Sequence, residues 1–389
     1  AMTALREQGR RAKAASYTLA AAGTAQKNAA LEAIADILTE RRDEWLAANA
    51  EDIAAAREAG MRSAMLDRLT LTEERIAGIV EAVRQVAALP DPIGKVDKME
   101  TRPNGLIIGR RRVPLGVVAI IFEARPNVTV DAAALCLKSG NVCILRGGKE
   151  AIRSNRKAAE LMRAALASEG LPEDCVSLVQ DTSHETANEL MHLDGYVDVL
   201  IPRGGAGLIR AVAKEASVPL IRTGEGVCHV YVDSEADLDM GARILYNAKC
   251  SRPSVCNAAE CLLVQEDVAE DFLKKAVPLL DKHQVELRCD ERTLAILGDR
   301  AVPAQESDWD AEYDDYVLAV RAVRDMEEAI SFINAHGTGH SEAIVTTNYF
   351  KAQRFLDAVD AAAVYVNAST RFTDGGEFGL GAEIGISTQ

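Results

Sequence analysis

The sequence predicts an α/β protein with a helical N-terminus, two doubly wound parallel-sheet domains and a projecting hairpin arm. Residues 3–90 hold only amphipathic, alanine-rich patterns of helical period. From residue 117 onward, short apolar runs alternate with helical segments in two successive blocks, which is typical of parallel sheets. Just before the first block, Asn104-Gly105 separates two extended runs, a strong hairpin signal.

The N-terminal part is predicted to form four helices. Three are expected at 5–22, 25–42 and 43–59. Thr70 and Glu73 have the spacing of a capping box and predict the start of a fourth helix, which Pro90 ends. The arm follows at about 97–113, and we expect its exposed edge strands to be covered by a second copy of the chain.

The first sheet is predicted to contain five strands, at 117–122, 142–145, 176–179, 197–201 and 218–222. Ligands of such sheets bind beyond the carboxyl ends of the strands, where three loops lie. The loops are 123–127 (EARPN), 146–149 (RGGK) and 202–207 (PRGGAG). The third loop leads into a helix, and free N–H groups at a helix start suit a pyrophosphate.

Candidate cofactor residues therefore lie in two of these loops. They are Gly204, Gly205 and Gly207 in one, and Arg146, Gly147, Gly148 and Lys149 in the other. The two cations offer charge for a further phosphate. The alternatives are that the glycines serve tight turning and that the cations belong to a solvated loop.

A second block predicts strands at 227–232, 262–264, 285–288, 316–320, 343–346 and 364–367. A helix expected at 236–248 is followed by a turn at Pro253 and then a buried strand. Such a turn presents one side chain, here Cys256, with Lys249 and Arg252 a few residues upstream. Cationic neighbours lower the pKa of a thiol and favour thiolate. The alternative is a buried, inert cysteine.

Composition limits the classes of function. A chain of 389 residues suits two or three domains, and a formal charge of −15 argues against nucleic-acid or anionic-membrane partners. No apolar run approaches the ~20 residues of a membrane-spanning helix. The eight cysteines form no Cys-x-x-Cys pair, which favours a reducing, cytoplasmic location. The histidines lack metal-ligand spacing, so we expect no metal.

Six segments together resemble the gamma-glutamyl phosphate reductases, a family of the aldehyde dehydrogenase superfamily. They are 113–117 (VPLGV), 123–129 (EARPNVT), 145–150 (LRGGKE), 201–207 (IPRGGAG), 252–257 (RPSVCN) and 364–381. The resemblance covers nearly the whole chain and implies an aldehyde-dehydrogenase-like fold. It implies a cofactor domain at 1–225, a catalytic domain at 226–368 and a segment at 369–389 that returns to the cofactor domain or a partner subunit. The family usually runs on beyond Gln389, so a C-terminal tail is expected to be absent.

The resemblance implies NADPH-dependent reduction of L-glutamyl 5-phosphate to L-glutamate 5-semialdehyde and phosphate, the second step of proline biosynthesis. A Cys256 thiolate would displace phosphate and form a thioester, which hydride then reduces. Asn127 and the Cys256 backbone N–H are the implied oxyanion donors, although Asn127 is also a candidate helix N-cap. Glu225 is a possible base, but the demand for one is weak because hydride, not water, resolves the thioester.

Substrate ligands are inferred from loop position. Arg125 and Arg371 are candidates for the α-carboxylate, and Glu383 or Asp374 for the ammonium. We expect a homo-oligomer, with glutamate kinase as a further candidate partner. Two other functions stay open: a catalytically silent partner subunit, and an ordinary aldehyde-oxidising dehydrogenase. Dependence on phosphate would separate the last from the reductase.

Overall fold

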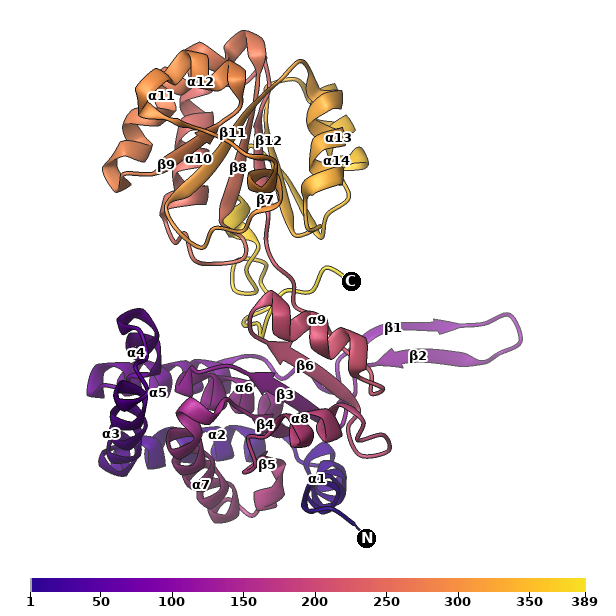
Figure 1. Ribbon diagram of the computed structural model, residues 1–389. Helices are drawn as coiled ribbons and strands as arrows, with labels where there is room; N and C mark the ends of the chain where they lie inside the picture. Colours follow the sequence, from indigo (N-terminus) through magenta and orange to yellow (C-terminus); the bar gives the residue numbers. More distant parts are fainter. Residues whose placement is uncertain (1) are drawn as a thin grey trace. The chain divides into compact units, whose positions relative to one another are not determined.

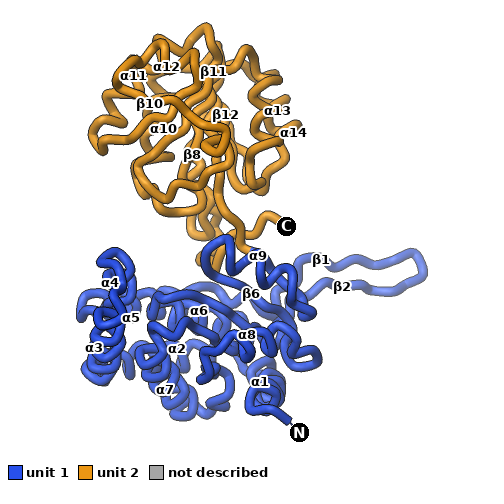
Figure 2. The backbone as a smooth tube through the Cα atoms, in the orientation of Figure 1, with its two compact units in different colours: residues 1–222 blue, residues 223–389 orange. Residues whose placement is uncertain are grey.

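The computed structural model describes residues 2–389, which form two compact units, one up to Arg222 and one from Thr223 onward (Figure 2). This boundary is close to the one expected after residue 225. Within the described residues, no helix is long and apolar enough to cross a bilayer.

The first unit begins with five helices, one more than predicted. They are α1 (Ala4–Ala20), α2 (Thr24–Glu40), α3 (Arg42–Glu58), α4 (Ser63–Leu69) and α5 (Glu73–Ala88). The predicted capping box at Thr70 and Glu73 is wrong. Thr72 is the N-cap of α5, because its hydroxyl accepts the Arg75 backbone N–H, whereas the Thr70 hydroxyl donates to the Leu66 carbonyl at the end of α4.

The predicted hairpin projects from the first unit as a two-stranded arm (Figure 1). Its strands are β1 (Val96–Thr101) and β2 (Ile107–Arg111), which pair antiparallel with Thr101 opposite Ile107. Every side chain of β2 is exposed, as are those of β1 apart from Glu100. Within its own unit the arm therefore has no hydrophobic core.

The first sheet has four parallel strands in the order β5-β4-β3-β6. Its strands are β3 (Val117–Phe122), β4 (Val142–Arg146), β5 (Val176–Leu178) and β6 (Val199–Arg203), and its helices are α6 (Pro126–Lys138), α7 (Ile152–Ser168), α8 (His184–Met191) and α9 (Ala206–Glu215). The fifth strand predicted at 218–222 is wrong. Only a single bridge joins Leu220 to Leu200, next to Pro219, which has no N–H to donate.

The second unit contains seven parallel strands in the order β10-β9-β11-β8-β7-β12-β13. The strands are β7 (Cys228–Val232), β8 (Ala259–Gln265), β9 (Glu286–Cys289), β10 (Val302–Pro303), β11 (Val317–Val323), β12 (Ser341–Val345) and β13 (Ala363–Val366). The helices are α10 (Leu238–Cys250), α11 (Ala269–Leu280), α12 (Glu291–Leu297), α13 (Met326–His336) and α14 (Tyr349–Ala358). The predicted parallel α/β architecture is confirmed in both units.

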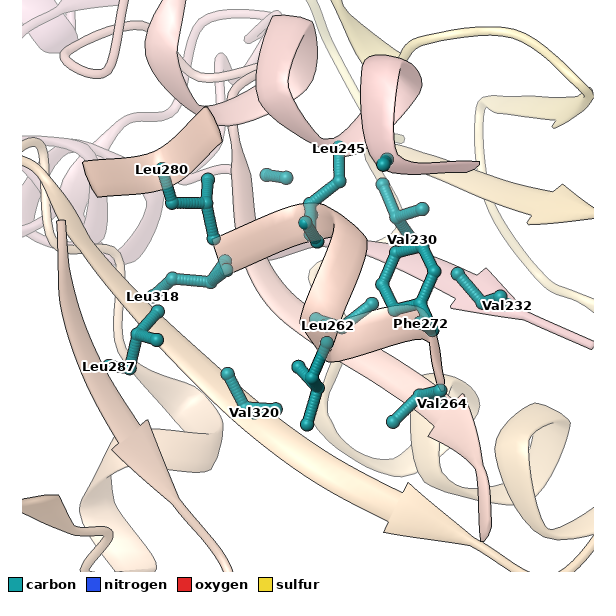
Figure 3. Packing of buried hydrophobic residues seen from close by; sticks show 14 of the residues in the cluster. Val230, Val232, Leu245, Leu262, Val264, Phe272, Leu280, Leu287, Leu318 and Val320 are labelled. Atoms are coloured by element: carbon teal, nitrogen blue, oxygen red, sulfur yellow. The ribbon is translucent and has the colours of Figure 1, made fainter. Parts of the chain in front are cut away.

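Both faces of the second sheet are buried, and alternate residues along its strands point into one or the other of two hydrophobic clusters. Val230, Leu262 and Val320 pack with Phe272 of α11 on one face (Figure 3). The residues between them on the strands belong to a second cluster with α13 and α14 on the opposite face. Because both faces are covered, the strands are almost continuously apolar, as expected for a parallel sheet. The chemistry of this unit is therefore confined to the ends of the strands.

Candidate functional site

The turn that carries Cys256 connects α10 to β8 at the amino end of β8. The helix ends at Cys250, and residues 251–258 form a series of turns before Ala259 enters the sheet. A backbone hydrogen bond from the Ala258 N–H to the Val255 carbonyl closes the turn around Cys256 at 3.0 Å. This is the presentation that the sequence predicted.

Cys256 differs from every other cysteine of the chain in its exposure. All eight cysteines are unpaired, and seven of them are buried, whereas Cys256 is partly exposed. Burial raises the pKa of Cys250 to about 11 and also raises the pKa of Cys261 well above its ordinary value. The two cysteines that flank Cys256 in sequence are therefore poor nucleophiles, and Cys256 is the accessible thiol.

The start of the second unit lies against this turn. Gly226 packs so closely on the Cys256 backbone that a Cβ at Gly226 would lie 1.5 Å from the Cys256 carbonyl oxygen. The Cys228 thiol donates a hydrogen bond to the same oxygen at 3.3 Å. Glu225, the possible base, immediately precedes Gly226, so the fold brings its backbone next to that of the thiol.

Two carboxyl groups lie around the turn, that of Glu260, which is buried, and that of Glu312, which is partly buried. Lys249 Nζ bonds Glu260 Oε2 at 2.9 Å, and both side chains are fully buried, so this pair joins the two ends of the turn. The sequence suggested Lys249 only as a cationic neighbour of Cys256, and in the structure its ammonium forms an ion pair with the Glu260 carboxyl group. Glu312 accepts the Gly226 N–H at 3.1 Å, and burial raises the pKa of Glu312 to about 7.

The segment after β13 also returns to the Cys256 turn. Arg371 donates from Nη1 to the Asn257 side chain and from Nε to Ser251 Oγ. Glu383 accepts the Gly375 N–H at 3.0 Å. The segment 369–389 is thus part of the second unit, and a contact with a partner subunit stays a prediction. Asp374 caps a local turn through the Gly376 and Glu377 N–H groups.

In the first unit, the three predicted loops follow the neighbouring strands β3, β4 and β6 at their carboxyl ends. The Gly205 N–H, at the start of α9, donates to Glu123 Oε2 at 3.2 Å. A Cβ at Gly204 would lie 2.7 Å from the Glu123 carboxyl carbon. The helix start therefore already receives a negative group, as expected of an anion site. Gly207 lies in the first turn of the same helix.

The two cations of the loop after β4, Arg146 and Lys149, have different surroundings. Arg146 Nη2 donates to the Thr182 and Ser183 carbonyls, and burial lowers the pKa of the guanidinium. Lys149 is exposed, and within residues 2–389 no carboxylate pairs with its ammonium. A Cβ would lie 2.3 Å from Asn155 Nδ2 at Gly147 and 2.5 Å from Glu150 Oε2 at Gly148, so both glycines pack closely against neighbouring side chains.

Asn127 is not the N-cap of α6. The helix begins at Pro126, and Arg125 is the N-cap residue without a side-chain cap bond. The capping alternative is therefore wrong. Asn127 Nδ2 instead donates to Asp131 Oδ2, one turn further along the helix, at 3.2 Å. Burial raises the pKa of Asp131, and Asn127 is partly buried beside it.

Four residues of these sites were not predicted from the sequence: Glu123, Gly226, Cys228 and Asn257. Their roles depend on contacts between segments that are distant in the chain, such as the one between Asn257 and Arg371, which are 114 positions apart. For Gly226, the one sequence signal of a close backbone contact was a glycine placed just before a predicted strand. Among residues 2–389, no group of three or more His, Cys, Asp or Glu side chains is placed to hold a metal ion.

Comparison with known proteins agrees with this arrangement. Residues 4–295 and 302–381 match the aldehyde dehydrogenase family. A gamma-glutamyl phosphate reductase of Clostridium perfringens is 59% identical over 382 residues, which cover 98% of this chain and 92% of that protein. One of Carboxydothermus hydrogenoformans is 58% identical over 380 residues, with 98% and 91% covered.

A solved structure shows the same fold over the whole length of this chain. The crystal structure of gamma-glutamyl phosphate reductase from Thermotoga maritima superimposes with a TM-score of 0.97 at 47% identity, covering 100% of this chain and 93% of that one. The resemblance seen in the sequence is thereby confirmed. The chain belongs to the aldehyde dehydrogenase family of oxidoreductases, in the group formed by the gamma-glutamyl phosphate reductases.

Proposed function

We propose that this protein reduces L-glutamyl 5-phosphate to L-glutamate 5-semialdehyde with release of phosphate, in proline biosynthesis, through a thioester on Cys256. The observation that carries the proposal is the exposure of this one thiol on a turn in a chain of this family. The names of its relatives indicate the substrate. An acyl phosphate is a suitable substrate because its phosphate is a good leaving group, whereas a free carboxylate does not accept hydride.

The Cys256 sulfur attacks the acyl carbon, its C–S bond forms, and the C–O bond to phosphate breaks. The released phosphate takes up a proton from water. When bound, the reduced nicotinamide supplies the hydride. The thioester carbon then becomes a tetrahedral oxyanion, and its collapse breaks the C–S bond and releases the aldehyde and the thiolate.

Two oxyanions arise on this route, one in each half of the reaction. Asn127 Nδ2 and the Cys256 backbone N–H are the proposed donors, each worth about 3 kcal/mol by analogy with other oxyanion holes. Asp131 supports this role of Asn127, because its bond fixes the orientation of the amide and leaves a second N–H for the substrate. Glu225 has no proton to remove from water here, so its role as a base stays secondary.

The cofactor of the family is a nicotinamide dinucleotide, and we propose NADPH in preference to NADH. Fit to the first unit is supported by the Gly205 N–H, which already holds a carboxylate at the start of α9. Gly147, Gly148 and Gly204 let the backbone of these loops pack against the side chains of Asn155, Glu150 and Glu123 respectively. Lys149 is the proposed contact of the 2′-phosphate, because the Arg146 guanidinium is bonded to backbone carbonyls.

For the substrate itself, we propose that Arg371 or Arg125 binds the α-carboxylate and that Glu383 binds the ammonium. Two nitrogens of Arg371 are engaged by Asn257 and Ser251, and no residue within 2–389 is bonded to its Nη2. Because these bonds already hold the guanidinium in place, it loses little further conformational freedom when it binds a carboxylate. Asp374 is the other candidate for the ammonium, and its carboxylate accepts the Gly376 and Glu377 N–H groups.

We further propose that the arm joins two copies of the chain into a homo-oligomer. Met99 and Ile107 are exposed by 66% and 69% on one face of a two-stranded ribbon, and such a ribbon is only marginally stable alone. Sedimentation tests this: replacing both residues with lysine should yield a monomer at micromolar concentration. A wild-type monomer under the same conditions would contradict it. A contact with glutamate kinase and a cytoplasmic location stay predictions.

Assay in the reverse direction tests the proposed activity. Glutamate 5-semialdehyde should reduce NADP⁺ beyond one equivalent per Cys256 only when phosphate is present, because phosphate must accept the acyl group from the thioester. Turnover that is independent of phosphate would instead indicate an ordinary aldehyde-oxidising dehydrogenase, in which water resolves the thioester. No reduction of either nicotinamide under any condition would favour a catalytically silent subunit.

A further inference from the structure

Asn257, which directly follows Cys256, is only 4% exposed, and its side-chain amide forms hydrogen bonds through both its nitrogen and its oxygen. Its Nδ2 donates to the carbonyls of Arg371, at 3.3 Å, and Thr373, at 3.0 Å. Its Oδ1 accepts from Arg371 Nη1 at 2.6 Å. The amide thereby uses both N–H donors and its acceptor on a single segment, 370–373.

Arg371 extends this contact to the other side of the nucleophile. Its Nε donates to Ser251 Oγ at 3.1 Å, so one guanidinium joins a residue before Cys256 to the residue after it. Thr370 adds a third tie, because its hydroxyl donates to the Asn257 carbonyl at 2.7 Å. The residues that carry Cys256 are therefore held between two points by a segment more than a hundred residues further along the chain.

The turn needs such support because little regular structure holds it. No helix or strand spans residues 251–258, where the Ser251 N–H bonds the Asn247 carbonyl and the Ala258 N–H bonds the Val255 carbonyl. A nucleophile that is displaced by about 1 Å can lose about 10²-fold in rate. A side chain that fixes the backbone on both sides of a thiol therefore acts on the reaction without touching the substrate.

We propose that Asn257 is a positioning residue that, with Arg371, clamps the Cys256 turn and sets the place and reactivity of the thiol. The proposal rests on Cys256 being the nucleophile of the proposed function. Arg371, the other residue of the clamp, thereby holds the turn in place, a role that is separate from any contact with the substrate carboxylate.

The first test compares Asn257→Ala with Asn334→Ala. Asn334 is in the same unit and bridges two segments by the same kind of bonds, from Nδ2 to the Ala358 carbonyl and from the Asp360 N–H to Oδ1. Both variants lose bridging bonds, but only Asn257 adjoins the thiol. Urea unfolding shows that each is folded under the assay conditions.

Two readouts separate positioning from a merely structural role. Asn257→Ala should lower kcat by about 30-fold or more with KM within about threefold, and should slow alkylation of Cys256 by iodoacetamide severalfold. Asn334→Ala should stay within about twofold of wild type in both. If Asn257→Ala matches Asn334→Ala in both readouts while folded, the clamp is wrong. Alkylation requires no substrate, so this result stands apart from a failure of the phosphate-dependence assay.

Arg371 provides an independent check should Asn257→Ala fail to fold. In Arg371→Ala, loss of the cation should shift the pH profile of Cys256 alkylation to higher pH, and millimolar guanidinium should restore the alkylation rate. The double variant Asn257→Ala/Arg371→Ala should react no more slowly than the worse single variant, because both remove one clamp. Multiplying losses in the double variant, or an alkylation profile that Arg371→Ala leaves unchanged, would overturn the proposal.

Discussion

The backbone of Gly226 lies against the Cys256 carbonyl so closely that a Cβ at Gly226 would be 1.5 Å from the oxygen. No Cβ tolerates this distance, and the neighbouring atoms are backbone, which cannot rotate away as a flexible side chain does. The segment that carries Glu225 can therefore approach the turn that carries Cys256 this closely only because Gly226 has no Cβ.

Gly226→Ala should displace the Cys256 turn and lower turnover by at least about 10²-fold, since a nucleophile is sensitive to shifts of about 1 Å. The matched control is Gly224→Ala, where the nearest atom to a Cβ is Thr388 Oγ1 at 3.5 Å, an ordinary contact. Turnover and thermal unfolding of both variants check this. Equal activity in the two would show that the close contact does not matter for the reaction.

The two cations after β4 should separate in their effects on the cofactor. Lys149→Ala should weaken NADPH at least about tenfold while leaving NADH within about twofold, because only NADPH has the 2′-phosphate. Arg146→Ala should weaken both cofactors alike, since it frees the loop at Thr182 and Ser183. Fluorescence titration with each dinucleotide measures this. Equal losses of NADPH and NADH in Lys149→Ala would exclude the assignment.

Asn127 should affect turnover without the stability loss of a missing cap, because Arg125 is the N-cap of α6. Asn127→Ala should lower kcat by about 10²-fold, as removal of other oxyanion donors does. Asn127→Asp should be worse, because a carboxylate repels both the oxyanion and Asp131. The kcat and unfolding midpoint of both variants decide the matter: near-normal kcat in Asn127→Asp would contradict the oxyanion role.

His340 should make the protein sensitive to acid. It is fully buried, and burial lowers its pKa from the ordinary 6.5 to about 4. The unfolded chain therefore binds a proton below pH 6.5 that the folded chain refuses, so stability falls as the pH drops from about 6.5 to 4. The full effect is about 3 kcal/mol in the free energy of unfolding.

Replacement with asparagine checks this origin of the pH dependence. Asparagine keeps a group near Nδ1, which bonds Ser341 Oγ, but does not titrate. The unfolding midpoint of His340→Asn should therefore fall less steeply between pH 6.5 and 4 than that of wild type. His336→Gln is the control, since His336 is partly exposed and pairs with Asp310. Parallel curves for wild type and His340→Asn would rule out this cause.

The parts of the fold that were predictable from the sequence are those with local signals. Both parallel sheets, the arm at Asn104-Gly105 and the turn at Cys256 follow from periodicity and turn residues. Thr70 misled because Thr72 has the same chemistry two residues later, and only the path of the chain between α4 and α5 decides which one caps. The run at 218–222 is apolar enough for a strand, but Pro219 leaves it with one bridge.

The residues that complete the candidate site could not be predicted for a different reason. Asn257 looks like an ordinary turn residue until Arg371 is beside it, and Glu123 looks like a solvated carboxylate until it meets the Gly205 N–H. These pairings depend on how separate loops converge at the ends of the strands. No local pattern carries that information, whereas the thiol itself was marked by its turn.

Detection of the thioester tests the central claim most directly. Protein mixed with glutamate 5-semialdehyde and NADP⁺ without phosphate, quenched in acid and digested, should carry one glutamyl group on the peptide that contains Cys256. Addition of phosphate before the quench should remove it, and Cys256→Ala should never acquire it. A glutamyl group on another peptide, or reduction of NADP⁺ by Cys256→Ala at the wild-type rate, would contradict the mechanism.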